Sequence, residues 1–345
     1  MIDYGRELNP EQLRVVMEPG GPLLVIAGAG SGKTRTLTHR VARLIETGVP
    51  PERIVLATFT NKAARTMLSR VKEITGVPTE RLWGGTFHHL SHRILRSNAG
   101  LLGYPANFSI IDSEDARQMI ASCIAASGID VKADRFPKAD VLGDIISLSA
   151  NMDAGIDAIL SSRYFHLQER FEKIREVARR YEARKREVGV MDFDDLLVLT
   201  RRLLRDFPDV ALRYAERFLH ILVDEYQDTN ILQADIVDLL AARHRNLMVV
   251  GDDSQSIYSF RGADFRNILH FPERYKDCRI FKLETNYRST PEILHLANLC
   301  IVRNDRQFHK VLKAVRDGGI RPVVVPTRNV LQQADFVAQR ILELH

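Results

Sequence analysis

One stretch near the N-terminus constrains the possible fold of this chain more than any other stretch does. Residues 23–27 are apolar, residues 28–32 form a loop of Gly, Ala and Ser, and Lys33 and Thr34 begin a helical pattern. A loop with almost no side chains lets successive backbone N–H groups converge on phosphate oxygens, and the helix N-terminus adds partial positive charge. The stretch therefore predicts a buried strand, a phosphate-binding loop and a helix.

The spacing fits the pattern G-x-x-x-x-G-K-[ST] of nucleotide-binding loops, except that Ala27 stands where the first Gly is usual. In that pattern Lys33 lies near the β- and γ-phosphates, and the hydroxyl of Thr34 is placed to hold Mg²⁺. The alternative is a small-residue loop that only joins a strand to a helix, but the Gly-Lys-Thr helix start favours nucleotide binding. The predicted phosphate loop comprises Ala27, Gly28, Ala29, Gly30, Ser31, Gly32, Lys33 and Thr34.

Composition sets wider limits on the class of protein. The chain has 345 residues, of which 45% are hydrophobic, enough for one large core or a few smaller ones. Its net charge of +5 permits nucleic acid as a partner, although a solvated basic face would give the same charge. The three cysteines are widely spaced and fit reduced thiols. Because neither a signal segment nor a membrane-spanning apolar run is found, we expect a cytoplasmic protein without membrane contact.

A second apolar run, at residues 54–57, follows the first helical pattern. Strand, helix and strand in this order imply an α/β fold with a parallel sheet and right-handed crossovers. The run leads into Phe59, Thr60 and Asn61, and another short strand ends just before His88. Ligands bind outside the carboxyl ends of parallel strands, so these residues are expected on the same edge as the phosphate loop. Phe59 is either a core side chain or a platform for a nucleotide base, and His88 alone is more often structural.

Strand signals stop between residues 91 and 191, where apolar residues recur at helical spacing. We interpret this region as an all-helical insertion in the sheet domain. Its Arg and Lys residues alternate with Glu, which favours a solvated face over a phosphate-binding surface. The predicted division is a sheet domain at 1–90 and 192–281, the insertion at 91–191, and the beginning of a second α/β domain at 282–345.

Two adjacent carboxylates, Asp224 and Glu225, follow the apolar run 219–223. Like charges at the end of a buried strand repel each other unless a cation joins them. Beside a phosphate loop, Asp224 is the expected ligand of Mg²⁺, and Glu225 is placed to polarise the water that attacks the γ-phosphate. The pair predicts nucleotide hydrolysis. It argues against a small-molecule kinase, which needs no water-activating glutamate.

A further strand at 246–250 leads to a loop that joins an amide to two aromatic side chains and an arginine. Gln255 can sense the γ-phosphate or its attacking water. Tyr258 and Phe260 can stack on bases, and Arg261 can bind a backbone phosphate. The alternative is a loop whose aromatic side chains simply pack inward.

The order of these motifs resembles that in the N-terminal half of UvrD/Rep/PcrA-type superfamily-one DNA helicases, over nearly the whole chain. Each matching block is weak to moderately specific alone, but seven blocks in the same order and spacing are highly specific. The resemblance implies a RecA-like P-loop NTPase sheet with an inserted all-helical subdomain and the start of a second α/β motor domain. The blocks are 8–12, 27–34, 58–64, 85–88, 224–230, 255–263 and 286–289.

The same resemblance implies roles for individual residues. Gln12 would read the adenine, Tyr287 would stack on it, and Arg35 would lie beside the nucleotide. Arg288 would reach the γ-phosphate as an arginine finger, and Gln255 would couple that phosphate to the DNA loop. The expected catalytic residues are Glu225, Gln255, Arg288 and Lys33, and the expected contacts to single-stranded DNA are Phe59, Thr60, Asn61, His88, Tyr258, Phe260 and Arg261.

As a whole, the resemblance implies an ATP-dependent 3′–5′ DNA helicase and translocase, with Mg²⁺ as cofactor and single strands and single/double-strand junctions as substrates. DNA repair is the favoured process. The later motifs of the second motor domain are absent, so we expect roughly half of such a protein to be missing. The alternative function is an ATP- and single-strand-binding module with little or no turnover.

Overall fold

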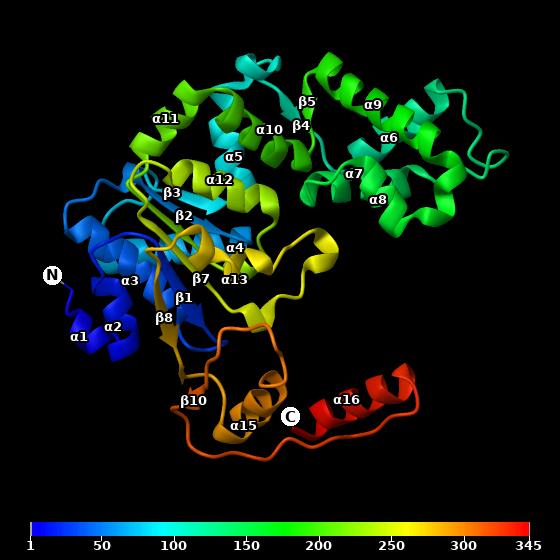
Figure 1. Cartoon of the computed structure of the whole chain (residues 1–345). Coiled ribbons are helices and arrows are strands. Elements are labelled where there is room, and N and C mark those ends of the chain that lie inside the picture. The colour runs from blue at the N-terminus through cyan, green and yellow to red at the C-terminus, as the bar shows by residue number, and fades with distance from the viewer. Residues whose placement is uncertain (1, 345) are drawn as a thin grey trace.

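A six-stranded sheet in which every pair of neighbouring strands is parallel forms the centre of the molecule (Figure 1). The structure is a computed structural model that describes residues 2–344, apart from the side chain of Arg261. Parallel order is confirmed, as the strand–helix–strand pattern predicts. In spatial order the strands are β3 (Trp83–Thr86), β2 (Ile54–Thr58), β6 (His220–Val223), β7 (Leu247–Gly251), β1 (Leu23–Ala27) and β8 (Arg279–Leu283).

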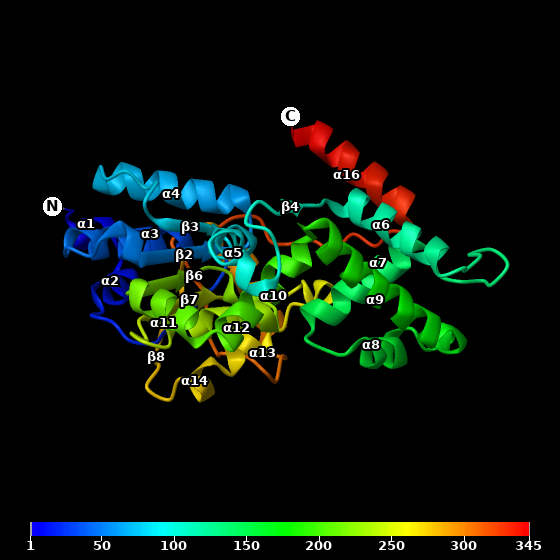
Figure 2. The same cartoon turned by 90° about the horizontal axis from the view of Figure 1, so that it is seen from above.

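Both faces of this sheet are covered by helices, because successive strand side chains point to opposite faces. Leu23 and Val25 of β1 pack in one cluster, and Leu24 and Ile26 pack in another. Figure 2 shows α3 and α4 on one side of the sheet and α11 and α12 on the other. The first side carries α2 (Pro10–Met17), α3 (Lys33–Glu46) and α4 (Asn61–Thr75), and the second carries α5 (Phe87–Arg96), α10 (Phe193–Asp206), α11 (Pro208–Arg217), α12 (Ile231–Ala241), α13 (Arg266–Leu269) and α14 (Phe271–Arg274).

Four helices form a separate lobe with its own core, which we call the helical lobe (Figure 1). Ile124, Leu142, Leu160 and Ile174, one from each helix, are buried in that core. Two short strands not expected from the sequence, β4 (Ser109–Ile110) and β5 (Val190–Met191), pair where the chain enters and leaves the lobe. The helices are α6 (Ser113–Ala126), α7 (Ala139–Asn151), α8 (Ile156–Arg163) and α9 (Phe171–Val188).

After β8 the chain leaves the main sheet and forms a small second sheet. Strands β9 (Thr285–Asn286) and β10 (Lys313–Ala314) pair in parallel around α15 (Pro291–Ile301). The last helix, α16 (Val330–Leu344), has no buried residue and lies beyond this small sheet (Figure 1). The exact division into three domains stays a prediction.

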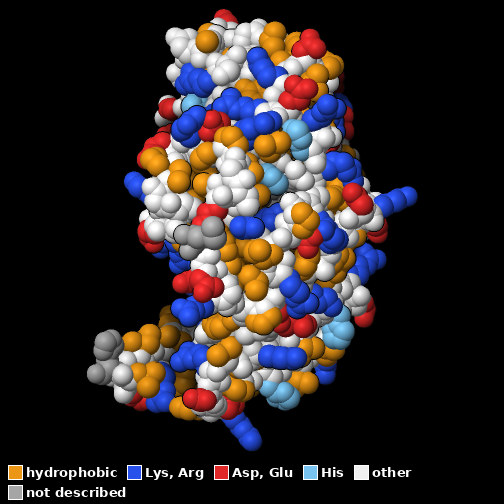
Figure 3. Space-filling model, turned by 90° about the vertical axis from the view of Figure 1, so that its left-hand side faces the viewer, with side chains coloured by type: hydrophobic (Ala, Val, Ile, Leu, Met, Phe, Trp, Pro, Cys, Tyr) orange, Lys and Arg blue, Asp and Glu red, His pale blue; other side chains and the backbone are white. Residues whose placement is uncertain are grey.

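The remaining surface features are less specific. On the face shown in Figure 3, Lys and Arg side chains are spread between acidic and hydrophobic ones. None of the helices within residues 2–344 is long and apolar enough to cross a membrane. A short helix, α1 (Tyr4–Glu7), precedes α2.

A buried lysine joins the helical lobe to the sheet domain. Lys185 of α9 is 1% exposed, and its Nζ lies 2.7 Å from both Asp192 Oδ2 and Asp195 Oδ2, at the start of α10. Asp192 also accepts a hydrogen bond of 2.8 Å from the hydroxyl of Tyr181. A buried charge with several partners destabilises a protein strongly when one partner is removed. Lys185 is therefore expected to hold the lobe in place.

We expect Lys185→Met to lower the free energy of unfolding by about 3–5 kcal/mol, because it leaves buried carboxylates without their cation. Urea denaturation measures this change. Arg184→Met is the control, since the exposed Arg184–Glu187 pair contributes at most about 1 kcal/mol. Equal effects of the two substitutions would contradict the assignment.

Candidate ATP site and nucleic-acid cavity

A cavity of about 670 Å³ lies at the carboxyl end of β1, and most of the predicted nucleotide-site residues line it. We call it the loop cavity. Its wall joins the N-terminal helices, the phosphate loop, the ends of β6 and β7, and the chain after β9. The predicted residues in the wall are Gln12, Ala29, Gly30, Gly32, Lys33, Thr34, Arg35, Glu225, Gln255, Tyr287 and Arg288.

Two glycines shape the phosphate loop. Gly30 and Gly32 have φ of +74° and +85°, a left-handed backbone that other residues rarely adopt. A Cβ on Gly32 would overlap Nε2 of Gln12. Helix α3 begins at Lys33, directly after Gly32, so its N-terminus faces the cavity. The remaining residues of the predicted phosphate loop, Ala27, Gly28 and Ser31, are buried and do not line the cavity. The hydroxyl of Ser31 donates a hydrogen bond of 2.7 Å to the Gly28 carbonyl.

The N-terminal helix α2 closes one end of the loop cavity. Asn9 and Gln12 form a capping box at the start of α2, whose first residue is Pro10. Nε2 of Gln12 donates to the Ser31 carbonyl at 3.1 Å, and Nδ2 of Asn9 donates to the hydroxyl of Tyr287 at 2.8 Å. The ring of Tyr287 remains half exposed, so this end of the cavity offers an amide and an aromatic ring together.

At the phosphate end, Lys33 and Glu225 form an ion pair. Nζ of Lys33 lies 2.6 Å from Oε2 of Glu225, which also accepts a hydrogen bond of 2.9 Å from Gln227. Glu225 has φ +50°, an uncommon conformation for a residue other than glycine. Such strain occurs frequently at functional sites, and here it turns the chain sharply at the end of β6. The carboxylate thereby enters the cavity instead of continuing the strand direction.

Asp224 fits the role of a cation ligand. Its Oδ1 is buried and has no hydrogen-bond partner among the described residues. Burial, and then the neighbouring Glu225 carboxylate, raise the pKa of Asp224 to about 7. A buried carboxylate oxygen without a donor is stabilised by a cation, and Thr34 supplies a hydroxyl in the adjacent cavity wall. These residues fit Mg²⁺, which takes few protein ligands when it also binds phosphates.

Three cationic or amide side chains complete the wall. Nε2 of Gln255 donates to Oδ2 of Asp252 at 2.6 Å, and Arg35 donates to the carbonyl of Glu7 and pairs with its carboxylate. Arg288 is exposed, and its guanidinium has no ion pair within the described part of the chain. Arg70 of α4 also lines the cavity and was missed from the sequence, because a lone arginine on a helix carries no motif.

A second cavity, of about 630 Å³, lies between the sheet domain and the helical lobe. We call it the aromatic cavity. Phe59, His88, Tyr258 and Phe260, all predicted DNA contacts, line it together. The rings of Phe59 and Tyr258 are stacked with centroids 5.2 Å apart, and Tyr258 and Phe260 are 6.1 Å apart. Phe260 is 65% exposed, so the inward-packing alternative does not describe it.

Two other predicted DNA contacts, Thr60 and Asn61, are not in this wall. Thr60 caps α4, because its hydroxyl accepts a hydrogen bond of 3.1 Å from the N–H of Ala63, and Asn61 is the first residue of that helix. Both are exposed beside Phe59. The side chain of Arg261 lies outside the described part of the structure.

Polar residues that the sequence did not reveal cross the aromatic cavity. Nδ2 of Asn230 donates to Oδ1 of Asn151 at 2.7 Å, and Nδ2 of Asn151 donates to Oδ1 of Asp194 at 2.7 Å. Burial raises the pKa of Asp194, and burial together with Glu225 raises that of Asp228 to about 6. These pairings join distant parts of the chain, so no local sequence pattern predicts them.

The fold and the phosphate loop place the chain among α/β P-loop proteins with an inserted helical lobe. A family model described as the UvrD/REP helicase N-terminal domain matches residues 8–276, and the chain belongs to this family. The chain is 40% identical to the ATP-dependent DNA helicase PcrA of Staphylococcus epidermidis over 339 residues, which is 98% of this chain and 46% of that protein. It is likewise 40% identical to PcrA of Staphylococcus aureus strain Mu50, over 97% of this chain and 45% of the relative.

The chain therefore spans just under half the length of these relatives. Both the family resemblance and the α/β fold predicted from the sequence are confirmed.

We expect Gly32→Ala to destabilise the chain more than Gly48→Ala. Both glycines have φ near +90°, so each substitution carries the left-handed strain of about 1–2 kcal/mol. Only the Cβ at position 32 would overlap Gln12, whereas the Cβ at position 48 meets no atom within 4 Å. Denaturant unfolding measures the free energy of unfolding of both variants. Equal decreases in that free energy would show that the overlap with Gln12 contributes nothing.

Proposed function

We propose that this chain binds ATP in the loop cavity and single-stranded DNA in the aromatic cavity, as the N-terminal half of an ATP-dependent 3′–5′ DNA helicase. The observation that carries the proposal is the loop cavity itself. It brings together Gln12, Lys33, Glu225 and Tyr287, which come from four distant parts of the sequence. The relatives are named ATP-dependent DNA helicases, which supports the same reaction.

In this proposal the adenine lies at the end of the cavity formed by Gln12 and Tyr287. The phosphates lie at the N-terminus of α3, where the helix end and Lys33 favour negative charge. Phosphate binding would draw Lys33 away from Glu225, since both anions compete for one ammonium group. Glu225 would then accept a proton from the water that attacks the γ-phosphorus, and the bond to the ADP oxygen would break. Arg288 would stabilise the negative charge of the transition state.

Asp224 and Thr34 would hold Mg²⁺, which supplies electrostatic stabilisation of the phosphate charge when bound. Asp224 directly follows β6, and Thr34 lies in the first turn of α3. The unpaired Oδ1 of Asp224 is the observation behind this assignment. Arg70, which shares the wall, is proposed as a further phosphate or ribose contact.

DNA would bind in the aromatic cavity by stacking its bases on Phe59, Tyr258 and Phe260. Stacking tolerates any base, as a motor that moves along arbitrary sequence requires. The 252–263 loop reaches both cavities, because Gln255 lines the first and Tyr258 and Phe260 line the second. A change at the γ-phosphate can thus be transmitted to the DNA through one short loop. Movement along DNA, junction binding, cytoplasmic location and a role in repair belong to this proposal.

A second candidate is an ATP- and DNA-binding module without turnover. The observation in its favour is the Lys33–Glu225 ion pair, which occupies the carboxylate that hydrolysis would need. Turnover measurements separate the two candidates.

We expect Glu225→Gln to reduce DNA-stimulated ATP turnover by about 10²–10⁴-fold, because the amide cannot accept the proton of the attacking water. ATP affinity should change little. Phosphate release with and without single-stranded DNA measures turnover, and Glu80→Gln, an exposed glutamate outside both cavities, is the control. Tight ATP binding without any turnover in the unaltered chain would favour the binding module.

We expect Phe260→Ala to weaken single-strand binding by about 1–3 kcal/mol, the contribution of one stacked base. Fluorescence anisotropy with a labelled oligonucleotide measures the affinity. Phe336→Ala removes an exposed ring of α16 that does not line the aromatic cavity, and it should leave the affinity unchanged. An unaffected affinity in Phe260→Ala would remove that side chain from the DNA site.

A further inference from the structure

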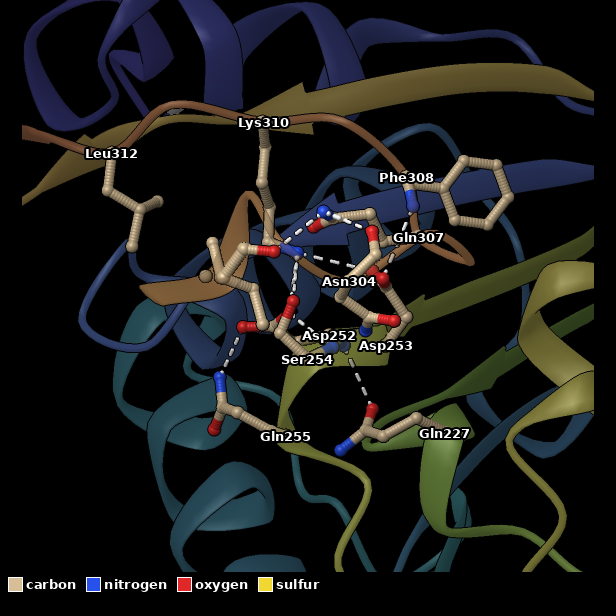
Figure 4. Close-up of polar contacts among 12 residues, drawn as sticks. Gln227, Asp252, Asp253, Ser254, Gln255, Asn304, Gln307, Phe308, Lys310 and Leu312 are labelled. Atoms are coloured by element: carbon tan, nitrogen blue, oxygen red, sulfur yellow. Dashed lines mark hydrogen bonds and ion pairs between the residues drawn. The ribbon is translucent and has the colours of Figure 1, made fainter. Parts of the chain in front are cut away.

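A lysine outside both cavities contacts the loop that joins them. Lys310 precedes β10, and its side chain is 4% exposed. Its Nζ lies 2.7 Å from Oδ1 of Asp252, 3.1 Å from Oδ1 of Asp253 and 3.0 Å from Oγ of Ser254. Figure 4 shows the ammonium group reaching from the 308–314 segment into the first turn of the 252–263 loop. These contacts use all the donor capacity of the ammonium group.

On its other side, Asp252 contacts the nucleotide-site residues. Its Oδ2 accepts the hydrogen bond of 2.6 Å from Nε2 of Gln255, and its backbone N–H donates to Oε1 of Gln227 at 2.9 Å (Figure 4). Gln227 in turn donates to Glu225. Asp252 thus links Lys310 directly to Gln255 and, through Gln227, to Glu225, which is proposed to accept a proton from the attacking water.

The 308–314 segment is anchored to the C-terminal part of the chain. The N–H of Leu312 donates to Asn298 of α15 at 3.3 Å, and its carbonyl accepts from the same side chain at 3.1 Å. The side chain of Leu312 also covers Gly28, where an added Cβ would lie 2.5 Å away. A movement of β10 and α15 therefore displaces Lys310, since the same short segment holds all of these contacts.

We propose that Lys310 is a positioning residue that couples the C-terminal α/β segment to the nucleotide site, by fixing Asp252 and through it Gln255. The inference rests on the proposed function and extends it. Its physical basis is a buried ammonium group between two buried carboxylates, an arrangement that is stable only while all three charges stay together. When the C-terminal segment moves, the group that orients Gln255 moves with it.

Steady-state ATP turnover with single-stranded DNA tests the proposal. We expect Lys310→Met to lower kcat at least tenfold with less than a threefold change in KM for ATP, because the nucleotide contacts themselves remain. Lys310→Arg, which keeps the charge, should recover most of the turnover. Lys313→Met is the control, because Lys313 is an exposed lysine of the same segment. Unchanged kcat in Lys310→Met would overturn the proposal.

A second variant distinguishes loss of the positioning role from loss of folding. Lys310→Met combined with Asp253→Asn removes a carboxylate together with the lysine and leaves Asp252 and Gln255 intact. We expect it to regain part of the stability that Lys310→Met loses, because one of the two buried carboxylates left without a cation is also removed, while kcat stays low. Full activity in this folded double variant would also overturn the proposal.

Amide hydrogen exchange tests the positioning role of Lys310 without a measurement of ATP turnover. If the unaltered chain binds ATP but does not hydrolyse it, the catalytic part of the proposed function fails, and Lys310 can still be tested. Loss of protection at residues 252–255 in Lys310→Met, but not in Lys313→Met, would support the positioning role. Unchanged protection in the folded Lys310→Met variant would overturn it.

Discussion

The parallel direction of all six strands is the constraint on which the rest of the structure depends. It brings every strand's carboxyl end to one edge, so the loops after β1, β2, β6 and β7 all lie along that edge. The strand order places β6 and β7 between β1 and β2. The loop cavity therefore lies on the β1 side and the aromatic cavity on the β2 side, and the residues that can connect them follow the two strands in between.

Buried lysines hold this arrangement together at the points where other parts of the chain meet it. Lys185 joins the helical lobe to α10, and Lys310 joins the C-terminal segment to the end of β7. Removing an ionised side chain from water is unfavourable unless its partners are close, so each lysine fixes a relative position rather than simply adding stability. Exposed pairs such as Arg180–Glu176 on α9 contribute much less, because solvent screens them.

Local patterns account for what could be predicted from the sequence. Three predicted parts of the site each follow a strand directly: the phosphate loop, Asp224–Glu225 and the 252–263 loop. Strand, loop and helix signals therefore locate them without knowledge of the fold. Thr60 shows the limit of such signals, since a hydroxyl directly before a helix is also an N-cap, and the structure uses it as one. The hydrogen bonds of Asn151 and Lys310 join residues far apart in sequence, and only the folded chain reveals them.

The position of Arg288 shows how far this chain organises the proposed ATP site. The family resemblance implies that Arg288 is an arginine finger. Two contacts tie the preceding residues to the phosphate loop: the N–H of Tyr287 donates to the Gly30 carbonyl at 2.9 Å, and Asn286 donates to the Ala29 carbonyl. The loop itself therefore determines where Arg288 enters the cavity. The C-terminal segment adds a second connection, through Lys310 and Asp252, to Gln255 and Glu225. A movement of that segment would therefore act on Gln255 and Glu225 more directly than on Arg288.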